Sequence, residues 1–307
     1  MKIESMLIVI NPQQPVPLML EKVFRLAAAF KPRIELFICD TETLLRGPDH
    51  SAAAAEQGLA KMRTERIAAL EALAAALRGA GHQVKVDALR FAPLHEGIVR
   101  HVLKRKPDLV IKEHQESITL ARAARIPTDH YLARDCPAPL LLLQPGAWSL
   151  SPQVVSAIDP CHPADRAAEL DMAVLAAGEA LSSSLGAAHQ CVHALQGPSH
   201  LVDEPPDQVA IAAQHQQNRQ IVERFFDRHA KGHATLHFLE SHPRQALIEF
   251  VKARACDILV MGAVARSRPH DPLIGGTAAA VLDAVSCDVL IIKSPGFISP
   301  VLIADEI

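Results

Sequence analysis

Residues 256–296 read CDILVMGAVARSRPHDPLIGGTAAAVLDAVSCDVLIIKSPG, and this stretch decides the fold. A short apolar run at 258–261 ends at Gly262, which is typical of a buried parallel strand. The glycine pair at 275–276 opens a periodic run of small residues, and a second apolar strand follows at 289–292. Glycines between a strand and a helix expose backbone N–H groups at the positive helix end, which suits a phosphate. An ordinary strand–helix turn has the same glycines, so their spacing alone leaves both interpretations open.

The composition is that of an ordinary α/β protein with room for two domains. The chain has 307 residues, is 49% apolar and 21% charged, and carries a net charge of −3. That charge, with one Trp and one Tyr, does not favour nucleic acid as a partner. No apolar run reaches the ~18 residues of a membrane helix, and no signal peptide is evident. Six scattered cysteines without a CxxC pair indicate reduced thiols, so we expect a cytoplasmic protein without a membrane partner.

The chain contains an internal duplication. Strand and helix patterns alternate in both halves, which predicts parallel sheets with helices on both faces. We therefore expect one domain at residues 1–147 and a second at 148–307. The landmarks that recur at nearly constant spacing are Asn11 with Asp159, Asp108 with Asp257, Cys136 with Cys287, and Gly146 with Gly296.

The glycine pattern and the segment IGGTAAAVLDAVSCDVLIIKSPG (274–296) resemble the universal stress protein family, most closely its tandem, E-type members. In the first half the resemblance rests on DLVIK…H (108–114) and on IPTDHYLARDCPAPLLLL (126–143). It implies two five-stranded, Rossmann-like parallel domains with strand order 3-2-1-4-5. It also implies that the two domains pair as a pseudo-dimer within the chain, and a homodimer is a further expectation. Each half ends in an apolar strand whose edge needs protection, which agrees with such a pairing.

The resemblance implies a small-molecule ligand in the second half, ATP or another adenine nucleotide. The resemblance implies that Asp159 hydrogen-bonds a ribose hydroxyl. The alternative is that Asp159 is the N-cap of the following helix. Arg266 would pair with phosphate oxygens, or it is a solvated loop charge. The chain departs from the family at Ala265, where a glycine is usual, and at Gly276, where a small polar residue is usual and Thr277 follows instead. The full set carried over by the resemblance is Asp159, Val192, Met261, Gly262, Ala265, Arg266, Gly275, Gly276, Thr277 and Ala278.

The first half differs chemically from the second. It has no glycine between Gly97 and Gly146, and residues 113–125 stand where the second half has its glycine loop. Bulky residues there would keep a phosphate away from the backbone. Its first strand ends in Asn11, where the second half has Asp159. We therefore expect the first domain to be degenerate and only the second to keep a partial nucleotide loop.

Two groups of histidines are the other candidate for a functional site. His189, Cys191 and His193 alternate along one predicted strand, and His233 and His237 share a face of the next. On neighbouring strands these side chains would offer zinc ligands, or they are buried and rim residues on separate faces. Their spacing matches no known zinc motif, so we expect no metal.

Catalytic motifs are absent from the sequence. It contains no nucleophile elbow, no HExxH motif and no Walker lysine. A stress-response binding protein is therefore favoured over an enzyme. Two alternatives remain: a slow ATP hydrolase that uses the same cleft, and a scaffold for a non-nucleotide small ligand.

Overall fold

The structure is a computed structural model that describes residues 1–12, 17–41, 52–115, 126–161, 167–195, 208–263 and 275–302. The chain divides into two compact units. The first comprises Lys2–Ala147 and the C-terminal segment from Ile298, and the second comprises Trp148–Phe297 and Met1. The central part of the second glycine loop, with Ala265 and Arg266, lies outside the described residues. So does most of the corresponding segment of the first half.

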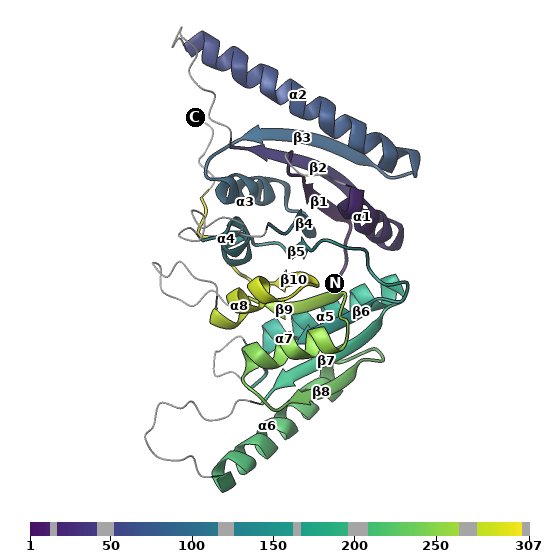
Figure 1. Cartoon of the computed structure of the whole chain (residues 1–307), viewed down its shortest axis with the longest axis vertical. Coiled ribbons are helices and arrows are strands. Elements are labelled where there is room, and N and C mark those ends of the chain that lie inside the picture. Colours follow the sequence, from purple (N-terminus) through teal and green to yellow (C-terminus); the bar gives the residue numbers. More distant parts are fainter. Residues whose placement is uncertain are drawn as a thin grey trace. The chain divides into compact units, whose positions relative to one another are not determined.

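The first unit alternates strands and helices along the chain (Figure 1). Its strands all pair in parallel, in the order β3-β2-β1-β4-β5. The strands are β1 (Ser5–Val9), β2 (Arg33–Asp40), β3 (Val84–Arg90), β4 (Leu109–Glu113) and β5 (Leu140–Leu143). The helices are α1 (Pro17–Phe30), α2 (Ala52–Gly79), α3 (Leu94–Arg105) and α4 (Thr128–Asp135).

The second unit repeats this order of elements (Figure 1). Its strands are also parallel, in the order β8-β7-β6-β9-β10. The strands are β6 (Gln153–Ala157), β7 (Ala188–Ala194), β8 (Thr235–Leu239), β9 (Ile258–Gly262) and β10 (Asp288–Ile292). The helices are α5 (Ala167–Leu185), α6 (Gln208–His229), α7 (Pro243–Ala253) and α8 (Gly276–Ala284).

The predicted α/β fold and the strand order 3-2-1-4-5 are confirmed for each unit. The uninterrupted apolar runs are the buried strands, since every residue of β5 and β10 is buried. Strand ends differ slightly from the prediction: β6 ends at Ala157, two residues before Asp159, and His233 precedes β8. The pairing of the two units as a pseudo-dimer stays a prediction. Among the described helices, none is long and apolar enough to cross a membrane.

Gly178 brings α5 close to the sheet of the second unit. A Cβ atom there would overlap Ser156 Oγ and stand 2.5 Å from His189 Nε2, and those two side chains hydrogen-bond each other at 2.9 Å in the core. A side chain at this position would therefore force buried polar groups apart. The absence of a side chain at Gly178 is a packing requirement.

We expect Gly178→Ala to lower the free energy of unfolding by about 1–3 kcal/mol, although alanine is the better helix former. Gly79→Ala is the matched control, because Gly79 is also helical and a Cβ atom added there would have no neighbour within 4 Å in the part of the chain that the structure describes. Urea denaturation of both variants checks this. Equal stability of Gly178→Ala and wild type would show that the helix shifts freely away from the strands.

Candidate functional site

The candidate site lies at the carboxyl ends of β6, β7 and β9. Ala157, the last residue of β6, pairs with Val192 on β7 and with Met261 on β9. The carboxyl ends of parallel strands meet at one edge of a sheet, so this register brings Asp159, Val192 and Met261 to the same edge. Val192 and Met261 are buried, whereas the Asp159 side chain is 44% exposed. Asp159 is therefore the carboxylate of this group that a ligand can reach.

Gly262 ends β9 at the same edge, and its role is visible in the packing. A Cβ atom there would stand 2.6 Å from Leu170 Cδ2 on α5. Close approach of α5 therefore explains the glycine without any ligand. The strand end and this helix lie together because Gly262 has no side chain.

The N-terminus of α8 carries no side-chain cap. Gly275 is its N-cap residue and makes no side-chain hydrogen bond, and the first turn contains no acidic residue. A Cβ atom added to Gly276 would have no neighbour within 4 Å among the described residues, whereas Ala278 is buried. The first backbone N–H groups, including that of Thr277, have no acceptor within the helix. Because α8 leads from the carboxyl end of β9, this positive helix end belongs to the same edge as Asp159.

Asp171 and His193 surround Asp159. The Asp159 N–H donates to Asp171 Oδ1 at 3.0 Å. His193 Nδ1 donates to the Ile158 carbonyl at 3.1 Å and lies 3.8 Å from Asp159 Oδ1. Burial raises the pKa of Asp171 to about 7. The hydrogen bond from the Asp159 N–H opposes this shift, and the negative charge of Asp159 adds to it. Burial also lowers the pKa of His193, although its carbonyl contact and Asp159 favour the charged form.

Sequence reasoning missed Asp171 as a member of this site. The available signal was an acidic residue beside Leu170 in the largely apolar helix α5. His193 was singled out, but as a metal ligand. The register of β7 and β8 separates the two histidine groups: His237 pairs with Val192, while His193 pairs with Phe238. His237 therefore lies on the face opposite to His189, Cys191 and His193, and β8 does not include His233.

In the first unit, the carboxylate of Asp129 lies at the corresponding edge of the sheet, beside the carboxyl end of β4. Asp129 is the second residue of α4, the helix that stands where the second unit has α8. Asp129 Oδ1 lies 2.8 Å from Lys112 Nζ, and its Oδ2 lies 3.0 Å from His114 Nδ1 and accepts the Gln115 N–H at 2.9 Å. Burial opposes the ionisation of Asp129, but Lys112, His114 and the Gln115 N–H outweigh it and hold the pKa below its usual range.

Equivalent backbone bonds confirm that these two edges correspond. The His114 N–H donates to Leu143 O at 2.7 Å, and the Ala263 N–H donates to Ile292 O at 3.1 Å, each joining the fourth and fifth strands of its unit. The first unit thus places an internal anion near the start of α4. The second unit places two glycines at the start of α8.

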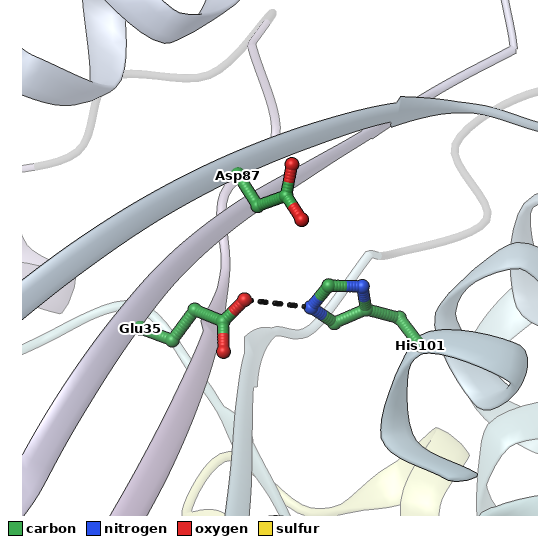
Figure 2. A group of neighbouring side chains, drawn as sticks. All are labelled: Glu35, Asp87 and His101. Carbon is green, nitrogen blue, oxygen red and sulfur yellow. Dashed lines mark hydrogen bonds and ion pairs between the residues drawn. The ribbon is translucent and has the colours of Figure 1, made fainter. Parts of the chain in front are cut away.

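One group of three candidate metal ligands occurs in the described residues, on β2, β3 and α3 of the first unit. The ligand atoms of Glu35, Asp87 and His101 all lie within 4.8 Å of one another (Figure 2). His101 Nε2 lies 2.9 Å from Glu35 Oε1, and its ring stacks on Phe37 at 3.9 Å between centroids.

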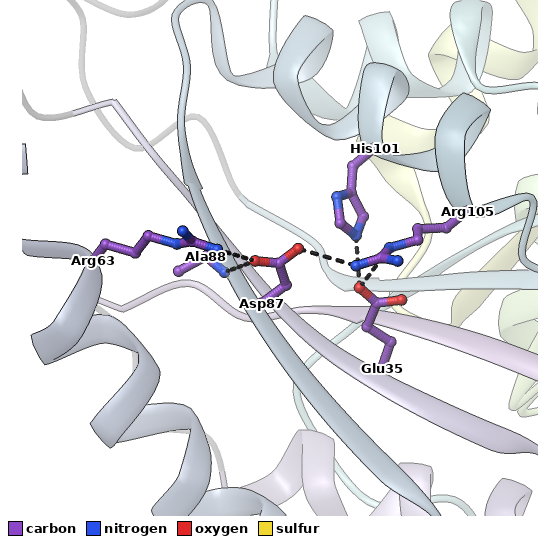
Figure 3. Close-up of polar contacts among 6 residues, drawn as sticks. All are labelled: Glu35, Arg63, Asp87, Ala88, His101 and Arg105. Atoms are coloured by element: carbon purple, nitrogen blue, oxygen red, sulfur yellow. Dashed lines mark hydrogen bonds and ion pairs between the residues drawn. The ribbon is translucent and has the colours of Figure 1, made fainter. Parts of the chain in front are cut away.

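Arginines already neutralise both carboxylates of this group (Figure 3). Arg105 lies 3.2 Å from Glu35 Oε1 through Nε and 3.2 Å from Asp87 Oδ2 through Nη2. Arg63 approaches the other oxygen of Asp87 at 3.2 Å. Burial works against ionisation of Asp87, but the Ala88 N–H, Arg63, His101 and Arg105 together lower its pKa. A cation would have to displace Arg105, so this group is an ion-pair network.

The sequence of this chain is similar to members of a known protein family. The model of the universal stress protein family matches residues 152–293. The chain is 25% identical over 323 aligned positions to universal stress protein E of Salmonella typhi, covering 99% of this chain and 98% of the relative. It is 24% identical to universal stress protein E of Escherichia coli (strain K12), with the same coverage.

Solved structures share the fold. A universal stress protein from Pseudomonas aeruginosa UCBPP-PA14 has a TM-score of 0.72 at 23% identity, covering 95% of this chain and 93% of that one. A universal stress protein from Archaeoglobus fulgidus DSM 4304 has a TM-score of 0.64 at 14% identity, covering 96% and 100%. The family model places residues 152–293 in the universal stress protein family, and the similarity to E-type relatives extends over 99% of the chain.

Proposed function

We propose that this protein is a stress-response binding protein that holds an adenine nucleotide in its second unit. The observation that carries the proposal is the open start of α8. It has an uncapped glycine N-cap and no acidic side chain in its first turn, and no described residue lies within 4 Å of a Cβ atom added to Gly276. Backbone N–H groups at a positive helix end bind phosphate oxygens, and Asp159 offers a reachable carboxylate for a ribose hydroxyl.

The first unit supports the proposal by contrast. Its own carboxylate, Asp129, accepts the Gln115 N–H and pairs with Lys112 at the corresponding edge. A phosphate approaching there would meet a buried negative charge. We therefore propose one nucleotide per chain, bound by the second unit alone.

Calorimetric titration with ATP and ADP tests the proposal. We expect one site per chain, and Asp159→Ala should weaken both nucleotides by about 10- to 100-fold, because a charged hydrogen bond to the ribose is lost. Asn11→Ala is the matched control, since Asn11 occupies the corresponding position of the first unit and should leave affinity unchanged. Two equivalent sites, or equal effects of the two variants, would contradict the proposal.

Gly276→Ala tests the phosphate contact separately. Because no described residue lies within 4 Å of a Cβ atom at Gly276, and alanine is the better helix former, we expect no loss of stability. Its methyl group would nevertheless stand at the helix end where the phosphate approaches, so ATP affinity should fall while the melting temperature holds. A lack of saturable ATP binding by the wild-type protein would favour a non-nucleotide ligand.

A further inference from the structure

The second unit has an arginine, Arg254, at the position that corresponds to Arg105 in the ion-pair network of the first unit. Arg105 is the fourth residue before β4, and Arg254 is the fourth residue before β9. Arg105 ends α3 and Arg254 directly follows α7, and each of these helices packs beside the second strand of its unit. Both residues are exposed to solvent. Arg254 is therefore the equivalent of Arg105.

The strand registers identify the counterparts of the two carboxylates. Glu35 pairs with the third residue of β1, and Gln190 pairs with the third residue of β6. Two residues farther along, Phe37 pairs with Asp87, and Val192 pairs with His237. Glu35 thus corresponds to Gln190, and Asp87 corresponds to His237. Both carboxylates that hold Arg105 are replaced by uncharged or basic side chains around Arg254.

Among the described residues of the second unit, this replacement leaves polar groups without partners. Within the described residues Arg254 has no ion pair, and its guanidinium lies over the Phe250 ring at 5.4 Å. The His237 ring lies 5.2 Å from the same ring, and burial together with the charge of Arg254 lowers its pKa. Gln190 Oε1 is buried and has no hydrogen-bond partner in the part of the chain described.

An open pocket of about 590 Å³ lies at this place. Gln190, His233, Thr235, His237 and Arg254 line it, together with the end of α5, and none of the described residues that line it is acidic. Its volume is in the range of small-molecule sites. The pocket lies near the amino ends of β7 and β8, so it is distinct from the carboxyl-edge site of Asp159 and α8.

We propose that this pocket binds a small organic or inorganic oxyanion, a carboxylate or a phosphate. The anion's oxygen atoms would take the place on Arg254 that Glu35 and Asp87 take on Arg105. A guanidinium binds such groups with two parallel hydrogen bonds, and Thr235 and the imidazoles supply further donors around it. The first unit carries its anions in its own sequence, whereas the second unit accepts one from solution.

Titration of the full-length protein with succinate and with inorganic phosphate, by calorimetry and by NMR of the His237 ring, tests the proposal. We expect saturable binding of at least one probe, weakened by about tenfold or more in Arg254→Gln. Arg105→Gln is the matched control and should bind as the wild type does. Phosphate is also titrated into Gly276→Ala, so that binding at the start of α8 is recognised separately.

A second variant tests the pocket without removing the arginine. Gln190→Glu combined with His237→Asp transfers the carboxylates of the first unit, and these should pair with Arg254 and exclude both probes. Unchanged circular dichroism would show that each variant folds. Failure of both probes to saturate the wild type, or binding by Arg254→Gln equal to that of the wild type, would overturn the proposal.

Discussion

Lys112→Met is expected to lower the free energy of unfolding by about 3–5 kcal/mol, because it leaves the carboxylate of Asp129 buried without its cation. Asp129 is fully buried, and Lys112 Nζ lies 2.8 Å from its Oδ1. Lys112 is itself buried and also donates to the Glu113 carbonyl at 2.7 Å. Methionine preserves most of the side-chain volume, so the measured loss would report mainly on the charge. Urea denaturation gives the change.

The double variant Lys112→Met/Asp129→Asn is the control that separates charge from packing. Asparagine keeps an oxygen that accepts the Gln115 N–H but carries no charge. The double variant should therefore be clearly more stable than Lys112→Met alone, with a coupling energy in the double-mutant cycle. If the effects of the two substitutions were simply additive, the ion pair would contribute nothing beyond its separate side chains.

Asp171→Asn is expected to stabilise the protein increasingly as the pH rises from about 4 to about 7, and then by a constant amount. The folded protein holds the pKa of Asp171 at about 7, well above that of an unfolded carboxyl group. Below the unfolded pKa, both states carry the proton and Asp171 costs nothing. Between the two pKa values only the unfolded state gains by ionisation, so the wild type loses stability across this window. The cost is on the order of 1.4 kcal/mol per pH unit.

Denaturation midpoints measured from about pH 5 to about pH 8 check this expectation. Asparagine retains an oxygen for the Asp159 N–H, so the hydrogen bond at 3.0 Å is kept. Asp227→Asn on the exposed face of α6 is the control and should follow the wild-type pH dependence. A constant difference between Asp171→Asn and wild type at every pH would show that Asp171 ionises as freely in the folded state as in the unfolded state.

Much of the fold could be predicted from local sequence patterns. Short apolar runs such as 258–261 and 289–292 have the length and bounds of buried strands, and the structure contains β9 and β10 there. The repeated order of strands and helices predicted parallel strands in each half, and the resemblance implied their order 3-2-1-4-5; the strand pairing confirms both. Such patterns are predictive because burial and the period of a strand or helix act on neighbouring residues.

The candidate site was only partly predictable. Asp159, Val192 and Met261 lie at one edge because each is within two residues of a strand end, whereas their binding of a nucleotide stays a prediction. Asp171 was not predicted, because it lies near the start of a largely apolar helix and meets Asp159 only when α5 packs beside the end of β6. Of the two interpretations of the histidines, strand register supports separate faces, because His189 and His237 lie on opposite faces of the sheet.

The sequence by itself determined the α/β class, the duplication and the glycine start of α8, since these depend on periodicity and on residues close together in the chain. Only the tertiary structure decided which charges meet. Asp129 pairs with Lys112 at the edge where the second unit has glycines, and Arg105 has two carboxylates where Arg254 has none among the described residues. These contacts join residues on different strands and helices, and their register fixes the electrostatics of each site. The chemical difference between the two halves therefore arises from packing that no local pattern encodes.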